Sequence, residues 1–147
     1  MKVSFVSSLL FGLFICPELG CYSGSQQNLE LQVIDSVYKQ VMAIHDEVMP
    51  KMGYIVALQD SLKQIAQTDF AIQDQDNDPR QLINDLAAAE EGMWVWMNNL
   101  KQIQTLSDSL NPILYYTQQI DSITAVKQKM LESIVNAESF IKSIEKQ

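Results

Sequence analysis

The sequence predicts an all-α protein in which long amphipathic helices form an antiparallel three-helix bundle with coiled-coil-like packing. Three observations carry this prediction. Glycine and proline are sparse, at 5 and 4 residues among 147, which favours helices over a turn-rich sheet fold. Apolar residues recur at steps of three and four along three stretches. Short polar connectors between these stretches favour antiparallel neighbours. A chain of this length has material for one core, so we expect one domain.

The first helix is predicted to begin near Leu29 and to continue past Pro50. Its apolar positions are Ile34, Val37, Val41, Ile44, Val48, Met52, Ile55, Leu62 and Ile65. Pro50 has no amide proton to donate to the carbonyl of Asp46, which costs ~3 kcal/mol in a regular helix interior. Because Gly53 follows three residues later, we expect the first helix to be kinked near Pro50.

The second helix is predicted to follow a polar connector, with Asp78 as N-cap and Pro79 at its first position. Gln81 is placed to complete a capping box with Asp78. The helix is expected to end near Gln104. Its core positions are Leu82, Leu86, Ala89, Met93, Trp96, Leu100 and Ile103.

The third helix is predicted from a second cap-plus-proline signal at Asn111 and Pro112. Its core positions are Ile113, Tyr116, Ile120, Ile123, Met130, Ile134, Ala137, Ile141 and Ile144. At about 34 residues this helix would be roughly 50 Å long. A helical hairpin that exchanges its third helix in a dimer is the alternative topology.

The N-terminus is typical of a lipoprotein signal peptide over residues 1–20. Lys2 provides a positive charge, and Val3 to Ile15 form an apolar run that is too short to span a bilayer comfortably. Gly20 places a small residue directly before Cys21. We expect the chain to be cleaved between these two residues and Cys21 to be lipidated. Residues 21–28 then form a lipidated tether, and residues 29–147 form the helical domain.

Two alternatives for the cysteines remain open. Cys16 is the rival lipid acceptor, although Ile15 is a poor residue before the cleavage site. A Cys16–Cys21 disulfide in a plainly secreted protein is the other possibility, but a bridge this short constrains little of the chain. The formal charge of −8 disfavours nucleic acid and anionic membrane surfaces as partners.

A stripe of thioether and imidazole side chains is the main candidate for metal chemistry. Met42, His45, Met49 and Met52 follow one another at steps of three, four and three, and Met93 and Met97 lie one turn apart beside two tryptophans. Thioethers and imidazole suit Cu(I) or Ag(I), and an indole face adds a cation–π contact. Packing of methionine in a helical core explains the same spacing. A soft-metal site is therefore the alternative function.

The sequence gives little support for catalysis. Asp46 and Glu47 follow His45 directly, and adjacent helical positions point about 100° apart, so at most one carboxylate can share the direction of the imidazole. His45 is the only histidine, and no nucleophile with a second base is evident. We expect no enzyme activity and no cofactor. Trp94 is predicted to point outward if Trp96 lies in the core, so Trp94 and Lys51 are candidate interaction residues.

The chain resembles a group of small Bacteroidota lipoproteins that often carry the automatic label "viral A-type inclusion protein". The resemblance lies in residues 43–52 (Ala-Ile-His-Asp-Glu-Val-Met-Pro-Lys-Met), in Met93 and Trp96-Met97, and in residues 134–138 (Ile-Val-Asn-Ala-Glu). It covers most of the mature domain. The resemblance implies a lipidated cell-envelope protein with a helical fold, and it supplies no activity.

Together these observations predict a helical structural or interaction module in the cell envelope, anchored by lipid to the outer or inner membrane. The segment after Cys21, from Tyr22 to Asn28, contains no acidic residue, which indicates a periplasm-facing anchor. A protein partner in the envelope is expected. The oligomeric state is left open.

Overall fold

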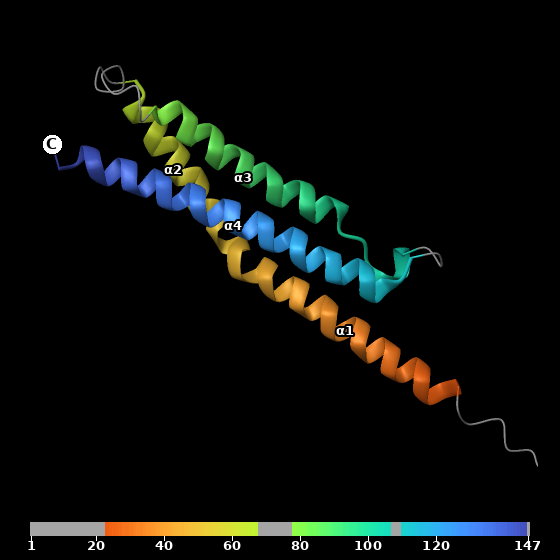
Figure 1. The fold of residues 1–147 in the computed structure, drawn as a ribbon. Coiled ribbons are helices and arrows are strands. Elements are labelled where there is room, and N and C mark those ends of the chain that lie inside the picture. Colours follow the sequence, from red (N-terminus) through yellow and green to blue (C-terminus); the bar gives the residue numbers. More distant parts are fainter. Residues whose placement is uncertain (1–22, 68–77, 107–109, 147) are drawn as a thin grey trace, which may run out of the picture.

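The computed structural model describes residues 23–67, 78–106 and 110–146, and within these ranges it contains only helices and connectors (Figure 1). Four α-helices and two short 3-10 helices follow one another. They are α1 (Ser23–Val48), η1 (Met49–Lys51), α2 (Met52–Ile65), α3 (Pro79–Asn99), η3 (Ile103–Thr105) and α4 (Pro112–Ile144). The predicted all-α class is confirmed, and helices from all three predicted stretches pack against one another. The predicted signal peptide and Cys21 lie outside the described residues.

The first predicted helix corresponds to α1, η1 and α2 together. α1 begins at Ser23 rather than near Leu29, so the helix includes residues 23–28, which the sequence predicts as part of a tether. The physical reason is that polarity keeps Gln26 and Gln27 out of the core without opposing a helix, since glutamine is a good helix former. The predicted tether is therefore helical from Ser23 to Asn28.

Regular α-helix is interrupted at η1, which contains Pro50. Proline has no backbone N–H, so the usual bond to the residue four positions earlier cannot form at Pro50. The tighter pattern of a 3-10 helix takes its place, and the N–H of Met52 bonds to the carbonyl of Met49. The chain then continues directly into α2.

The start of α3 agrees with its predicted cap, whereas its end does not. Asp78 Oδ1 accepts a hydrogen bond of 2.9 Å from the backbone N–H of Arg80. Gln81 does not close the predicted capping box, because its amide donates instead to Asp85 Oδ1 at 2.9 Å. The helix ends at Asn99 rather than near Gln104, because the backbone of Leu100 is extended. Residues 100–106 form a connector that includes η3.

The bounds of α4 agree closely with the third predicted helix. Asn111 Oδ1 accepts from the backbone N–H groups of Ile113 and Leu114, at 3.0 and 3.1 Å. These two bonds satisfy donors that the first turn of a helix otherwise leaves free. The helix then runs for 33 residues to Ile144.

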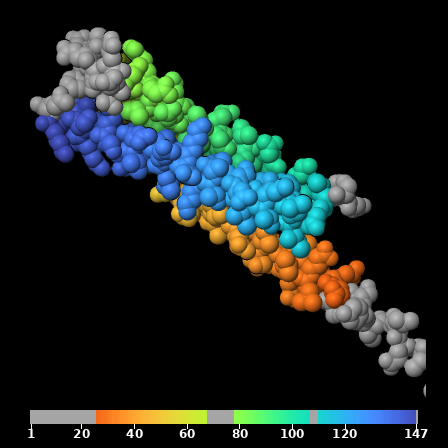
Figure 2. All heavy atoms as spheres, in the orientation of Figure 1, coloured from red at the N-terminus to blue at the C-terminus, as the bar shows by residue number. Residues whose placement is uncertain are grey.

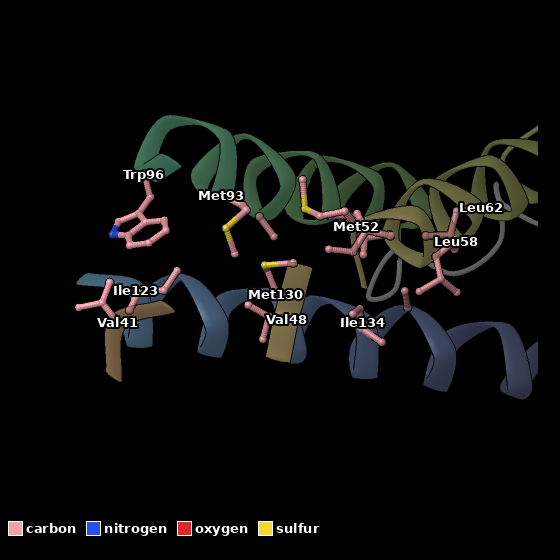
Figure 3. Close-up of a cluster of buried hydrophobic side chains, with 14 of the residues drawn as sticks. Val41, Val48, Met52, Leu58, Leu62, Met93, Trp96, Ile123, Met130 and Ile134 are labelled. Atoms are coloured by element: carbon pink, nitrogen blue, oxygen red, sulfur yellow. The ribbon is translucent and has the colours of Figure 1, made fainter. Parts of the chain in front are cut away.

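One hydrophobic core joins the helices (Figure 3). α1 packs mainly against α4, whereas α2 packs mainly against α3, and α3 and α4 pack against each other. The largest fully buried side chains are Tyr116, Ile55, Leu62, Leu86, Met93, Ile123, Met130, Val41 and Val48. Most of these positions were predicted from the three-four spacing. The main packing partner of this part of the chain therefore changes from α4 to α3 across η1.

The first turns of α1 extend beyond the end of the bundle that α3 and α4 form (Figures 1 and 2). Ile34 is buried, whereas the residues from Gln26 to Val33 are exposed. They include Leu29, Leu31 and Val33, three of the most exposed large apolar side chains among the described residues. We call residues 23–33 the α1 extension.

Candidate functional site

His45 lies on α1 at the boundary between core and solvent, with 13% of its side chain exposed. Its Nδ1 lies 2.9 Å from Asp46 Oδ1. The imidazole stacks on Trp96 of α3, with ring centroids 5.9 Å apart and ring planes at 30°. The carboxylate partner of His45 is therefore the next residue in the chain, and its aromatic partner comes from another helix. These contacts hold the ring of His45 in place against α3.

Trp96 is buried below this imidazole, in the core position that the sequence predicts. Its Nε1 is buried and has no hydrogen-bond partner in the described part of the chain. An unpaired buried N–H costs about 1–3 kcal/mol. Burial of the large indole surface in the core offsets this cost, since an aromatic side chain buries 150–250 Å² or so. The role of Trp96 is thus dominated by packing.

Two residues after His45, α1 forms an ion pair with α4. Lys127 Nζ donates to Glu47 Oε2 at 2.6 Å, across 80 residues of sequence. Both side chains remain partly exposed to solvent, so the pair is expected to contribute at most about 1 kcal/mol. Its main effect is to fix how α1 lies along α4.

A third contact follows η1, where Tyr54 of α2 donates its hydroxyl to Glu138 Oε1 of α4 at 2.7 Å. This hydrogen bond is the main reason that the pKa of Glu138 is lowered from 4.5. Partial burial opposes the shift, and the positive charges of Lys142 and Lys51 reinforce it. The same hydrogen bond raises the pKa of Tyr54.

The first of the three stretches that carry the family resemblance thus lies close to both of the others. The charge of Lys51, from the first stretch, acts on Glu138 from the last. His45, from the same first stretch, stacks on Trp96 of the middle one. The segment from Met42 to Met52 therefore has neighbours on both α3 and α4. Sequence spacing along one helix cannot reveal these pairs, because each partner comes from a distant part of the chain.

The six residues of the predicted metal site lie in different environments. Met52 and Met93 belong to the buried core, and Met49 and Met97 are partly buried and pack against it. Met42 and His45 are also half-buried. Figure 3 shows Met93 and Met52 among apolar side chains, together with Met130 of α4, which the metal prediction does not include. Packing accounts for the four methionines that contact the core. The metal site stays a prediction.

Among the described residues, no group of three or more His, Cys, Asp or Glu side chains is placed to hold a metal ion. Within the same residues, no helix is long and apolar enough to cross a membrane.

Trp94 and its neighbour Val95 lie on the outer side of α3 and are 45% and 47% exposed. The outward direction predicted for Trp94 is confirmed. No residue from Gly92 to Leu100 is charged, although charged residues make up 19% of the chain. Interface cores are depleted in charge and enriched in tryptophan. Trp94 is therefore a candidate anchor for a protein contact, with the exposed Asn98 and Glu91 four and three residues away on the same side of α3.

Tyr115 and Tyr116 are covered by the connector between α3 and α4. The hydroxyl of Tyr115 accepts from the backbone N–H of Lys101 at 2.9 Å and donates to the carbonyl of Asn99 at 3.4 Å. Tyr116 donates to the carbonyl of Lys101 at 3.0 Å, and burial raises the pKa of Tyr116. Both tyrosines thus fasten the connector to α4.

An open groove of about 480 Å³ lies between α1 and this connector, and sequence reasoning did not predict it. Its lining includes Leu31, Ile34, Tyr38, Ile103, Gln104 and Tyr116. Tyr38 and Tyr116 meet edge to face there, with ring centroids 5.2 Å apart. The connector side of the groove is formed by residues 102–104, which follow the end of α3 at Asn99.

Comparison with protein-family models, with curated proteins and with solved structures finds no match. The family remains an expectation from sequence. Function must accordingly be argued from the surfaces and contacts described above.

Proposed function

We propose that the chain is a lipid-anchored module of the cell envelope that binds a protein partner through its helical surface and performs no catalysis. The proposal combines the lipoprotein-like N-terminus of the sequence with the surface around Trp94. In it, Cys21 carries the lipid, the domain faces the periplasm, and the partner is another envelope protein.

The exposed indole of Trp94 is the observation that carries the binding part of this proposal. Its helix is fixed on the opposite side by Met93 and Trp96, which are buried. A side chain on such a rigid helix loses little conformational freedom on binding, which favours affinity. Lys51, the last residue of η1, is a second candidate for partner recognition.

We also propose that the bundle is antiparallel and that the first helical segment bends near Pro50. Figure 1 supports this arrangement, since α2 leads upward to the start of α3 and α3 leads back to the start of α4. The 3-10 turn at Met49–Lys51 supports the bend. Such a bend would allow one segment to pack first on α4 and then on α3.

The binding proposal is tested by Trp94→Ala in the full-length chain. We expect recovery of the partner in a crosslinked pull-down from the bacterial envelope to fall on the order of tenfold or more, because a buried tryptophan anchor typically contributes 2 kcal/mol or more. Lys51→Ala should produce a smaller loss. Quantitative mass spectrometry of the recovered proteins is the measurement.

Val135→Ala is the matched control, since Val135 is 58% exposed on α4. It should leave recovery unchanged. If Trp94→Ala and Val135→Ala recover the same proteins in the same amounts, the Trp94 surface is not the binding site. If no partner is recovered and deletion leaves the envelope unchanged, the interaction function itself fails.

A further inference from the structure

One side of α1 carries an exposed row of uncharged residues, which we call the α1 stripe. It consists of Leu29, Val33, Ser36 and Gln40, at steps of four, three and four, so the four side chains share one side of the helix. All four are exposed. Asp35 and Lys39 form an ion pair of 2.6 Å that lies about a quarter turn or more away from the stripe.

The stripe begins on the α1 extension, which no other helix of the described residues covers at this end of the bundle (Figure 1). Leu29 is 57% exposed and Val33 is 46% exposed. Leu31 is also 57% exposed, but it lies about 200° around the helix from Leu29 and lines the groove beside the connector. The two leucines therefore face different surroundings.

The expected lipid attachment point is close to this row. Cys21 precedes Ser23, the first residue of α1, by two residues, which can span at most about 7 Å. Leu29 lies roughly 9 Å further along the helix and Gln40 roughly 26 Å. Apolar residues of an interfacial helix reach about 5–10 Å into the headgroup region. Leu29 and Val33 can both reach that depth only when α1 lies along the bilayer.

We propose that the α1 stripe lies on the bilayer surface, so that the bundle rests lengthwise on the membrane to which Cys21 is anchored. This inference rests on the lipid anchor of the proposed function. The occupant of the stripe is the lipid surface.

Charge and size favour a lipid surface over a second copy of the chain. The stripe has no charge in a protein whose formal charge is −8. The next residue on the same line of α1 that carries a charge, Glu47, lies about two turns beyond Gln40 and is paired with Lys127, so anionic headgroups are not repelled by the stripe itself. Two large apolar side chains are far fewer than the roughly 20–30 residues that each partner contributes to a stable protein interface. A narrow row of this kind suits the shallow contact of an interfacial helix.

Photo-crosslinking in intact cells tests this inference directly. The full-length chain is produced with p-benzoylphenylalanine at Leu29, Val33, Leu31 or Val135, one position at a time, in bacteria whose fatty acids carry a radioactive label. Acyl attachment at Cys21 is measured first in the same samples, by mass spectrometry of the N-terminal peptide. Light-dependent lipid adducts to the probe-containing peptide are then quantified.

We expect lipid adducts at Leu29 and Val33 that exceed those at Leu31 and Val135 at least several-fold. Leu31 is the matched control for Leu29, because the two have equal exposure on one helix. Equal yields at all four positions, with Cys21 acylated, overturn this inference and leave the anchor intact. Crosslinks from Leu29 to a second copy or to another protein also overturn it. An unacylated Cys21 refutes both the anchor and the inference.

Discussion

The ring pair formed by His45 and Trp96 shows how far a single residue can be understood from its sequence position. The sequence places Trp96 in the core, and it is buried there. The stacking between the two rings joins helices that are separated by the whole of α2. No spacing rule along one helix contains that information. The same holds for the bond between Tyr54 and Glu138.

Glu138 provides a prediction of how stability depends on pH. Its pKa in the folded chain is below the ordinary value of 4.5. The ionised carboxylate therefore stabilises the native state above about pH 5, and this contribution is lost as the pH falls through the lowered pKa. The substitution Glu138→Gln should lower the melting temperature near neutral pH. The difference in melting temperature between this variant and the unmodified protein should become smaller toward pH 3. Circular dichroism melts across this range measure it.

Tyr54→Phe serves as the partner variant for this test. It removes the hydrogen bond that is the main cause of the lowered pKa of Glu138, so it should reproduce the direction of the pH dependence. A difference between Glu138→Gln and the unmodified protein that grows as the pH falls would contradict the account.

The capped starts of α3 and α4 are better determined by local sequence than the end of α3. Asp78 and Asn111 both cap the helices that follow them, as predicted. The end of α3 was misjudged because Leu100 and Ile103 continue the apolar spacing, although they pack against the core from an extended connector. Apolar periodicity indicates which side chains contact the core. It does not indicate the backbone conformation that places them there.

The cap of α4 is a prediction at this scale. Asn111→Ala should lower the free energy of unfolding by about 1 kcal/mol, because two backbone N–H groups lose their acceptor. For a chain of this size that corresponds to a drop of roughly 2–4 °C in melting temperature. Urea unfolding followed by circular dichroism gives the free energy.

Asn111→Asp is expected to keep most of this stability, since aspartate is an equally good cap. Ser122→Ala, at an exposed position in α4, is the neutral control. Equal unfolding free energies for Asn111→Ala and Ser122→Ala would show that the cap contributes nothing.

The whole molecule confirms the predicted fold class, because composition and apolar periodicity are properties of the entire chain. The core follows from the same periodicity: Val41, Ile123 and Ala137 are all fully buried where the pattern places them. The groove beside the connector could not be predicted, since it depends on where one helix stops relative to another. The interaction candidates could be predicted only in part. Trp94 faces outward as expected, whereas the partner proposed for it is another molecule that this sequence does not describe.

The soft-metal alternative has a test that involves the entire domain. A ligand that binds the native state raises its stability, by about 2.7 kcal/mol at a hundred times its dissociation constant. We expect anaerobic addition of Cu(I) to leave the melting temperature unchanged, because Met52 and Met93 are already packed among apolar neighbours.

The variant His45→Ala, Met49→Leu is the control for the metal test. If Cu(I) raises the melting temperature of the unmodified protein and not that of the double variant, the packing account of the stripe is wrong. Calorimetric melts with and without the metal distinguish the two cases.

The 3-10 turn at Met49–Lys51 has a consequence for how the chain tolerates insertions and deletions. It connects a helix held by α4 to one held by α3, so the turn sets the rotation of each relative to the other. Each residue of an α-helix advances about 100° around its axis. Loss of one residue here would turn Tyr54 away from Glu138, or else His45 away from Trp96. The length of this turn is consequently more constrained than the identity of its exposed proline.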